Sequence, residues 1–406
     1  MLLATALAAA LIGSTQTAQS DAQFESAVTA LRDSGGTILL GPRDYGRLVV
    51  GPRGPSPLRI VGTRGTRVER LLFDHARQVS AGGFTVAPRV QDAWIEVDAS
   101  QHVDLHDLLV TAQGTSLSAS VVVPDSSDVT IRRSTFTHCG DRSIGFSNCV
   151  LLYRWSRRVT VEDNWFHDCY GCDFLHGRFG FDLTIRRNRF ERTLPCRMGR
   201  YRCGHQDLVE FFLGRRLRVE SNHFGVYRSG GAQLYLTNAI DHATIVNNVF
   251  VGTDRRVPGY HSRVAVIVGS RGTRRVPHDV KIVNNTILTG ARRRDGYEGS
   301  IRFSSLYGGV PRRLRPVVAN NVIALLGQQW PVCDAARVFA ANVVLHGQAC
   351  TSSNVVGPAE LDARGRPTAQ SALLIDQASR RWAPSRDITG RRRGPVSDIG
   401  AYEFRG

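Results

Sequence analysis

The sequence is short of lysine, of helical periodicity and of long apolar segments. Lys281 is the single lysine, so a lysine base is not expected to carry the chemistry. No long stretch after Leu31 repeats its apolar residues every 3.6 positions, which argues against a helical bundle. Beyond residues 1–20, no apolar segment is long enough to span a bilayer. The chain also lacks a basic-aromatic module typical of nucleic-acid binding.

The N-terminus has the composition of an export signal. Residues 1–20 carry no charged side chain, and an apolar run from Met1 to Ile12 is followed by small polar residues. This pattern predicts a signal peptide over residues 1–20, cut after Ala18 or Ser20. The mature chain is therefore expected to be secreted, periplasmic or part of the cell envelope, with no membrane span.

A short motif recurs along the chain. Each copy contains β-forming residues, an Asn, one spacer and then an apolar residue, as in VTVEDNWF (Val159–Phe166), and an eighth copy has Ser134 in place of Asn. The seven motif asparagines are Asn164, Asn188, Asn222, Asn248, Asn285, Asn321 and Asn342. Uneven spacing around a fixed strand predicts an all-β fold, a right-handed parallel β-helix with loops of variable length. The Asn amides would stack as a ladder and the Phe rings would stack inside.

The two ends of the chain differ from this repeat. Asp21–Arg32, with apolar Phe24, Val28 and Leu31, is the best helix candidate and is expected to cap the open end of the stack. The sequence predicts a β-helix domain over residues 21–357, which includes this cap. Residues 358–406 lack the repeat and are expected to form an irregular C-terminal cap or tail.

Three thirteen-residue segments align without gaps and end in the repeated strand. They are CVLLYRWSRRVTV from Cys149, DFLHGRFGFDLTI from Asp173 and DLVEFFLGRRLRV from Asp207. The alignment predicts three columns: Cys149, Asp173 and Asp207; Leu152, His176 and Glu210; Arg154, Arg178 and Phe212. Because strand side chains alternate between faces, inward-pointing Leu151, Leu175 and Val209 would leave His176, Glu210 and Arg178 exposed.

Eight cysteines in an exported chain indicate disulfides. Cys139 and Cys169 each follow a motif Phe by three residues, so they are expected to stack on adjacent turns. The predicted pairs are Cys139–Cys169, Cys149–Cys172, Cys196–Cys203 and Cys333–Cys350. The alternative is a zinc site built from Cys169–Cys172 and Cys196–His205.

Variable loops of a solenoid gather on one face, which is usually the binding face. Four polar excursions, the longest from Glu191 to Gln206, bring ionisable and amide side chains to an exposed groove there. The candidate catalytic residues are His176, His205, Asp207, Glu210 and Tyr235. The candidate substrate-binding residues are Arg178, Arg228, Gln233, Tyr260, His261 and Arg263.

Structural roles are the alternative for several of these residues. Asp173 and Asp207 share the inward parity of the core and could cap strand starts by accepting backbone hydrogen bonds. His205 could anchor its loop. Gln233 and Tyr235 could be residues of a surface ladder.

The formal charge is +17, from 52 basic and 35 acidic residues. Many arginines are compatible with a plain solvated surface, but they also attract a polyanion. Guanidinium groups match sugar carboxylates with two parallel hydrogen bonds. Since export argues against nucleic acid, the expected partner is an acidic polysaccharide.

Two reactions fit the candidate residues. In β-elimination, His176 or His205 removes the proton α to a uronate carboxylate, and Tyr235 or Tyr260 is the acid. Arginines or Ca²⁺ would neutralise the carboxylate.

Carboxylates have two candidate roles in these reactions. In β-elimination, Asp207 and Glu210 would hold Ca²⁺ or position the base. In hydrolysis, two carboxylates flank the glycosidic bond, and Asp207 with Glu210 or Asp173 could do this.

The Asn-x-Phe turns, the opening GGTILLGPRDYG (Gly35–Gly46) and the ending DIGAYEF (Asp398–Phe404) resemble secreted bacterial right-handed parallel β-helix proteins of the pectin-lyase-like superfamily. The resemblance covers nearly all of the mature chain and implies the β-helix fold. That superfamily includes polysaccharide lyases, polygalacturonases, uronan epimerases and proteins without catalysis. The Gly-His-Gly and Arg-Ile-Lys motifs of polygalacturonases and the Arg-x-Pro-x-x-Arg pattern of pectate lyases are absent, so no catalytic residue is carried over.

The resulting expectation is an exported, monomeric polysaccharide lyase that acts on a uronate-containing polymer. A glycoside hydrolase or a uronan epimerase on the same fold is one alternative. A non-catalytic cell-envelope or glycan-binding β-helix protein is the other.

Overall fold

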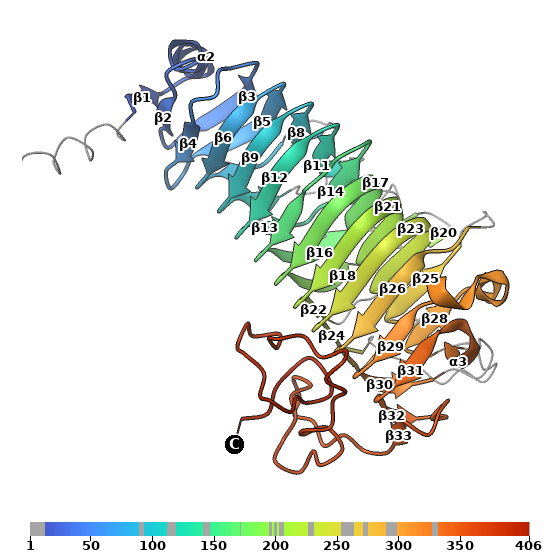
Figure 1. Cartoon of the computed structure of the whole chain (residues 1–406). Helices are drawn as coiled ribbons and strands as arrows, with labels where there is room; N and C mark the ends of the chain where they lie inside the picture. The colour runs from blue at the N-terminus through green and yellow to red at the C-terminus, as the bar shows by residue number, and fades with distance from the viewer. Residues whose placement is uncertain are drawn as a thin grey trace, which may run out of the picture.

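The protein is a long stack of parallel strands with a helix at one end and an irregular tail at the other (Figure 1). The computed structural model describes residues 13–88, 93–111, 119–140, 147–170, 172–194, 197–198, 201–202, 207–225, 231–252, 264–270, 275–289, 299–326 and 332–405. Within them, the strand pairs are parallel except for β19 (Arg197–Met198) with β20 (Tyr201–Arg202). No helix in these ranges has the length and apolar character needed to cross a membrane.

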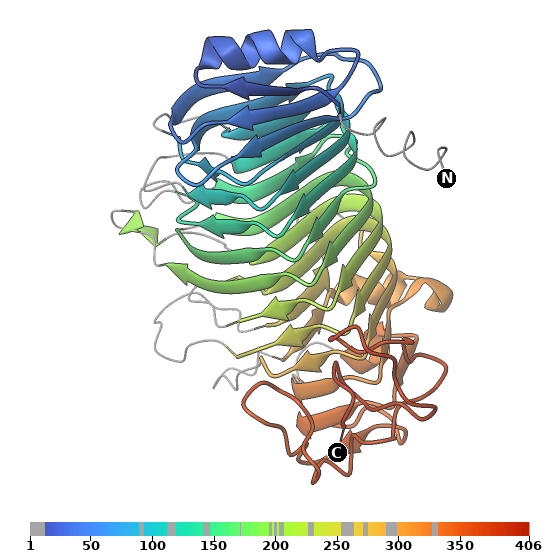
Figure 2. The same cartoon turned by 90° about the vertical axis from the view of Figure 1, so that its left-hand side faces the viewer.

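Each turn of the chain crosses three sheets, and strands of the same sheet pair from rung to rung (Figure 2). The first sheet contains β1 (Thr15–Ala18), β2 (Gly36–Leu40), β4 (Leu58–Gly62), β6 (Arg77–Gly82), β9 (Gln101–His106), β12 (Ser127–Arg132), β15 (Thr160–Glu162), β26 (His278–Val283), β29 (Val317–Ala319) and β31 (Val338–Ala340). The second sheet contains β7 (Thr85–Val86), β10 (Leu109–Thr111), β13 (Thr135–Thr137), β16 (Trp165–Tyr170), β18 (Arg189–Leu194), β22 (His223–Phe224), β24 (Val249–Phe250), β27 (Thr286–Ile287), β30 (Val322–Leu325), β32 (Val343–His346) and β33 (Val355–Val356).

The third sheet carries the candidate site. It contains β8 (Ile95–Asp98), β11 (Ala119–Pro124), β14 (Ser147–Tyr153), β25 (Val266–Gly269) and β28 (Ile301–Phe303). Three long strands continue from the third sheet into the first: β17 (Cys172–Arg186), β21 (Val209–Glu220) and β23 (Leu234–Val246). In the earliest rungs, β3 (Asp44–Val50) and β5 (Arg67–Asp74) run through the second and third sheets.

An asparagine ladder fixes the corner between the first and second sheets. From Ser134 through Asn164 to Asn354, the backbone N–H of each ladder residue donates to Oδ1 of the next, at 2.9 or 3.0 Å. The side-chain amide also binds the stack, as when Asn222 Nδ2 donates to the carbonyl of Ile185 at 2.8 Å. The predicted ladder is confirmed, and the structure adds Asn354 to it.

The residue before each ladder position takes a left-handed conformation, with φ between 48° and 56° from Arg133 to Ala341. This residue turns the chain at the corner, from the first sheet into the second. In the Asn-Asn pairs Asn247–Asn248 and Asn284–Asn285, the first Asn occupies the left-handed position, which Asn tolerates better than most residues.

The apolar residue two places after the ladder residue points into the interior. Phe136, Phe166, Phe190, Phe224 and Phe250 form a continuous column with ring centroids 4.5–5.1 Å apart. These rings are fully buried. The predicted interior aromatic stack is therefore confirmed, and its spacing follows the spacing of neighbouring strands.

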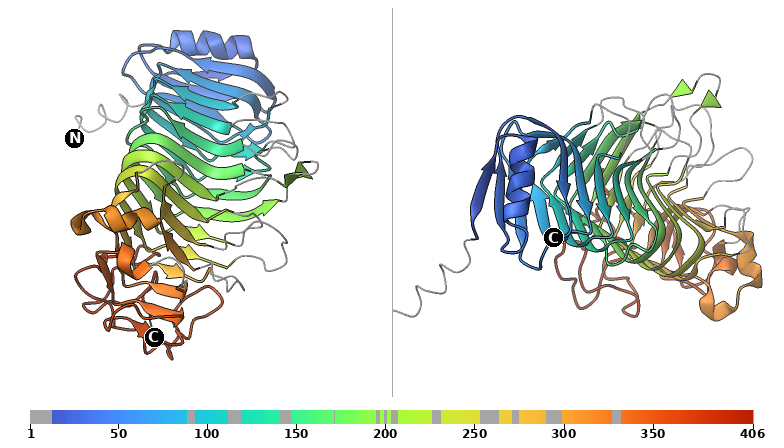
Figure 3. Two further views of the ribbon diagram at one scale, coloured as in Figure 1. Left: turned by 90° about the vertical axis from the view of Figure 1, so that its right-hand side faces the viewer. Right: turned by 90° about the horizontal axis from the view of Figure 1, so that it is seen from above.

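The predicted helical cap is also confirmed. Helix α2 (Asp21–Ala30) lies across the first rungs (Figure 3). It buries Phe24 and Ala27. Ser20 is its N-cap and accepts from the backbone of Gln23 at 3.1 Å.

The stack begins before the predicted cleavage sites. Strand β1 pairs with β2 from Thr15 to Ala18, and Ser20 caps α2. A cut after Ala18 or Ser20 would remove β1, so those cleavage positions conflict with the first rung. Export itself stays a prediction.

The C-terminal tail is an ordered wrap rather than a loose one. It forms no helix or strand between Pro358 and Arg405. Three short helices come before it in the sequence: η1 (Ser305–Gly309), η2 (Arg312–Leu314) and α3 (Val332–Ala335). The tail returns to the ladder corner, where the amides of Asn247, Asn284 and Asn320 donate to its carbonyls at 2.7–3.0 Å. The DIGAYEF motif contributes Glu403, which forms a buried ion pair with Arg393 at 3.0 Å.

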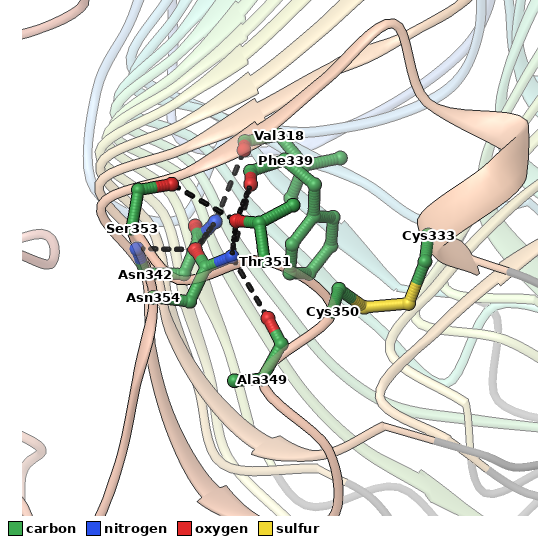
Figure 4. Close-up of a disulfide and its surroundings, with 9 residues drawn as sticks. All are labelled: Val318, Cys333, Phe339, Asn342, Ala349, Cys350, Thr351, Ser353 and Asn354. Atoms are coloured by element: carbon green, nitrogen blue, oxygen red, sulfur yellow. Dashed lines mark hydrogen bonds between the residues drawn. A yellow bond between two sulfur atoms is a disulfide. The ribbon is translucent and has the colours of Figure 1, made fainter.

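One predicted disulfide is present, Cys333–Cys350, close to the end of the ladder at Asn342 and Asn354 (Figure 4). Cys196, Cys203 and the side chain of Cys172 lie outside the described part of the chain, so the Cys196–Cys203 pair stays a prediction.

The other predicted disulfide pairs need correction. Cys139, Cys149 and Cys169 are buried thiols, so neither Cys139–Cys169 nor Cys149–Cys172 is formed. Cys149 and Cys169 lie close together, with their Sγ atoms 3.2 Å apart, because Cys149 points inward from β14 toward the end of β16. Burial raises the pKa of the Cys139 thiol well above its ordinary value, which keeps this third thiol protonated.

Removing one ladder amide should destabilise the stack. In Asn222→Ala, the backbone N–H of Asn188 and the carbonyl of Ile185 lose their partners in a dry interior. We expect the free energy of unfolding to fall by roughly 2–5 kcal/mol, measured by urea denaturation. Asn222→Ser should cost less, because Ser134 shows that a serine Oγ can accept a ladder hydrogen bond. Unchanged unfolding midpoints in both variants would contradict a stabilising ladder.

Oxidative folding should join Cys149 to Cys169. The two thiols would pass two electrons and two protons to a disulfide donor such as oxidised glutathione. Alkylation under denaturing conditions followed by peptide mass mapping should find this bond, with Cys333–Cys350 as the internal positive control. A Cys139–Cys169 bond, or alkylation of all three cysteines, would refute the assignment.

Candidate functional site

A row of polar residues stands on the outer face of the third sheet. Leu175, Val209 and Leu234 point inward and are fully buried. The residues that follow them, His176, Glu210 and Tyr235, pair in register across β17, β21 and β23. Because strand side chains alternate, these three lie on the outer side of neighbouring rungs, about 4.8 Å apart.

The predicted columns hold between β17 and β21 but not for their members from β14, where Asn148 and not Cys149 pairs with Asp173. His176 aligns with Glu210, and Arg178 aligns with Phe212, as expected. The β14 residue that pairs with His176 is Leu151, not Leu152. Leu152 is fully buried, so the inward and outward residues of β14 are shifted by one position relative to the ungapped alignment.

His176 is held between two carboxylates. Its Nδ1 lies 3.3 Å from Asp173 Oδ2 and 3.5 Å from Glu210 Oε2. The exposed fractions of the side chains are 22% for His176, 13% for Asp173 and 3% for Glu210. The cluster is thus largely dry, and His176 is its most accessible member.

Asp173 has two contacts, only one of which was expected. Its Oδ1 accepts from the backbone N–H of Asp207 at 2.8 Å, which confirms the role of capping a strand start. Its other oxygen contacts His176, which was not predicted because the two residues have opposite strand parity. Phe174 and Leu175 are both buried, and their backbone N–H groups both donate to the carbonyl of Leu208, so strand alternation is broken between Asp173 and His176.

The cluster shifts the protonation of its members. Burial disfavours the charged imidazole, but hydrogen bonds and charges from Asp173 and Glu210 outweigh it and raise the pKa of His176 to about 9. Burial raises the pKa of the Asp173 carboxyl, and the charge of Glu210 adds to this increase although His176 opposes it. At neutral pH, His176 is therefore an imidazolium flanked by acidic groups.

The contacts also select a tautomer. Both carboxylates lie at Nδ1, so this nitrogen keeps its proton when the ring becomes neutral. The lone pair of the neutral ring is then on Nε2. The same arrangement orients the histidine base in carboxylate–histidine dyads of hydrolytic enzymes.

Two predicted site residues lie inside the stack. Asp207 is fully buried, and its Oδ1 accepts from the backbone N–H of Ala232 at 2.5 Å, so it caps a strand start instead of facing the groove. Gln233 is also fully buried. Its amide donates to the carbonyl of Val251 at 2.8 Å and accepts from Thr289 Oγ1 at 2.7 Å. Gln233 therefore supports the interior of a corner and is not exposed in the predicted groove.

The other predicted residues divide into two groups. Arg178 is exposed two residues beyond His176, and Tyr235 is 8% exposed beside Glu210. The remaining candidates lie outside the described residues and stay predictions: His205, Arg228, Tyr260, His261 and Arg263.

A divalent cation is one occupant that the cluster could accept. The ligand atoms of Asp173, His176 and Glu210 all lie within 4.8 Å of one another. Ca²⁺ prefers six to eight oxygen ligands, so a set with an imidazole and two carboxylates fits it poorly. The expected Ca²⁺ pair of Asp207 and Glu210 is not formed, because the Asp207 side chain lies in the interior.

A second polar surface lies on the first sheet, away from this cluster. It is a groove of about 360 Å³, and its carboxylates are Asp104, Asp128 and Glu162. Each of them forms an ion pair of 2.6 Å with an arginine, and the pairs are Arg132–Asp104, Arg158–Asp128 and Arg186–Glu162. These charges are mutually neutralised, so the His176 cluster is the stronger candidate for chemistry.

Comparison with known proteins agrees with the architecture. Residues 95–287 match the family described as the right handed beta helix region. The chain is a right-handed parallel β-helix. No curated protein matches the sequence of this β-helix.

Several solved structures resemble the β-helix at low sequence identity. The ORF18 protein of Geobacillus virus E2 is 13% identical, with a TM-score of 0.45, over 75% of this chain and 60% of that chain. An alginate lyase from Paenibacillus is 14% identical, with a TM-score of 0.40, over 66% and 93%. DFA-IIIase from Arthrobacter chlorophenolicus is 14% identical, with a TM-score of 0.41, over 88% and 98%. At this distance the likenesses assign no activity, so function is argued from the cluster.

Proposed function

We propose that this β-helix is an exported enzyme that cleaves a uronate-containing polysaccharide by β-elimination. Its reaction centre would comprise Asp173, His176, Glu210 and Tyr235. The observation that carries the proposal is the contact of His176 Nδ1 with two carboxylates on the outer face of the third sheet. Strongly perturbed protonation of this kind concentrates at functional sites.

His176 has the properties of a general base. Its neutral form directs a lone pair from Nε2, and a pKa of about 9 makes it a stronger base than an ordinary histidine. Asp173 and Glu210 stabilise the imidazolium that forms when Nε2 takes up a proton. They act as positioning residues in this reaction.

In the proposed reaction, Nε2 of His176 takes the proton from the carbon next to the uronate carboxylate. The electron pair of that C–H bond forms a carbon–carbon double bond, and the glycosidic C–O bond on the next carbon breaks. The leaving oxygen takes a proton from the hydroxyl of Tyr235, one rung beyond Glu210. The products are a chain with an unsaturated uronyl end and a chain with a new hydroxyl.

The substrate carboxylate needs positive charge beside it while the proton leaves. Arg178 is exposed on the same strand as His176, two residues further on, and alternation places both on the same face. The formal charge of +17 would draw a polyanion to the surface. One chain supplies all of these groups, which fits a monomeric enzyme.

Glycoside hydrolysis is the second candidate, and one observation favours it. Carboxylate oxygens of Asp173 and Glu210 lie within 4.8 Å of each other. Carboxyl groups about 5–5.5 Å apart are typical of retaining glycosidases. The raised pKa of Asp173 would suit the acid of such a pair.

Replacing His176 tests which reaction takes place. We expect His176→Gln to lower kcat/KM on polygalacturonate, alginate or hyaluronan by at least about a hundredfold, since general bases contribute about 10²–10⁴-fold. The far-ultraviolet absorbance of the unsaturated product reports turnover. His242→Gln is the matched control, because His242 also contacts two carboxylates, Asp241 at 2.8 Å and Asp279 at 3.6 Å, but on an exposed corner of the stack.

The pH dependence of the wild-type enzyme tests whether His176 acts in its neutral form. A base acts in its neutral form, so kcat/KM should rise about tenfold per pH unit below the His176 pKa of about 9 and level off above it. New reducing ends without the absorbance change would establish hydrolysis instead. A rate that falls as pH rises from 7 to 9 would rule out His176 as the base.

A further inference from the structure

Trp155 is an exposed aromatic residue at the corner where the third sheet meets the first. Its side chain is 60% exposed, the largest value among the exposed apolar residues of the described chain. Its ring stacks on Phe181 with centroids 5.8 Å apart and planes 11° apart, and it also meets Phe179 at 5.8 Å. One side of the indole is thus supported by two rings while much of its surface faces water.

Two arginines accompany this aromatic group. The guanidinium carbon of Arg178 lies 5.4 Å from the Phe179 ring and 5.6 Å from the Phe212 ring. Arg154, next to Trp155 in the chain, lies 5.3 Å from the Tyr153 ring, but its Nη1 is also 3.9 Å from Asp125 Oδ2, so its charge is partly neutralised. Cation–π contacts of this kind hold a guanidinium in place while its N–H groups remain able to bind an anion.

The aromatic group adjoins the proposed reaction centre. Arg178 is two residues from His176 on one strand, which corresponds to about 7 Å. Phe179 follows Arg178 directly in the sequence, and its ring contacts Trp155. A sugar chain that passes His176 can therefore reach the indole without leaving the surface of the stack.

We infer that Trp155, Phe179 and Phe181, with Arg178, form a subsite for an acidic sugar ring next to the reaction centre. This inference rests on the proposed function, because it assigns the sugar to the same substrate chain. The apolar C–H face of the sugar packs on the indole, and the carboxylate is bound by a guanidinium fork. The supporting rings fix the indole before binding, so little conformational entropy is lost.

Trp165 provides an internal comparison. It is 39% exposed and has the guanidinium carbon of Arg189 at 5.6 Å from its ring, but it lies on the second sheet. Its Nε1 donates to Glu191 at 3.2 Å, and the same Glu191 forms an ion pair with Arg189. The charge of Arg189 is therefore neutralised locally, so an acidic sugar is not expected to bind there.

Binding can be measured without turnover. The background is the full chain carrying His176→Gln, and the probes are defined hexamers of galacturonate, mannuronate and hyaluronan, with cellohexaose as the neutral control. Isothermal titration should show binding of at least one acidic hexamer and weaker binding of cellohexaose. Trp155→Ala and Arg178→Gln should each weaken binding by about tenfold or more, since Trp and Arg dominate binding hot spots. Trp165→Ala should change it by less than about twofold.

The control for folding is far-ultraviolet circular dichroism, which should be unchanged because Trp155 is exposed. Arg178→Gln should also reduce the dependence of binding on salt. Binding of no acidic hexamer, or equal losses in Trp155→Ala and Trp165→Ala, would overturn the subsite. Failure of the proposed reaction would give a different result. An acidic hexamer that binds through Trp155 but is never cleaved by the wild-type protein would support the subsite and refute the lyase.

Discussion

The register between successive rungs is the constraint on which the rest of the structure depends. Asn222 and its ladder neighbours bind the backbone of one rung to the side chain of the next, and the Phe166–Phe250 stack packs directly inside that corner. A slip by one residue would break every ladder hydrogen bond and turn the interior Phe outward. Because the ladder resists such slips, residues far apart in sequence are held in fixed columns on the outer walls.

The proposed site is a consequence of that register. Glu210 lies one rung from His176, and Asp173 lies at the start of the strand that carries His176. No loop has to fold over to assemble the three side chains. Burying these ionisable groups together costs free energy, and the proton that His176 Nδ1 holds beside the two carboxylates offsets this cost. The same contacts give the imidazole a basicity suited to proton abstraction from a carbon.

The sequence predicted features that depend on residue type at a fixed spacing. The ladder, the Phe stack, the helical cap and the His176–Glu210 column belong to this class. The sequence could not predict where the alternation of a strand is broken. Asp173 contacts His176 although the two residues differ in strand parity, Gln233 is buried just before β23, and Leu151 of β14, not Leu152, pairs with His176. These outcomes depend on three-dimensional packing at the corners, which alternation along one strand does not encode.

The most direct test of the account is a nitrogen-15 NMR titration of the histidine side chains, with His176 assigned by the loss of its signals in His176→Gln. The account predicts a pKa near 9 and, above it, a neutral ring protonated on Nδ1. Glu210→Gln should move that pKa downward, because one of the two negative partners is lost. A His176 that titrates near 6.5 with the other tautomer would show that the register does not bring these three groups together.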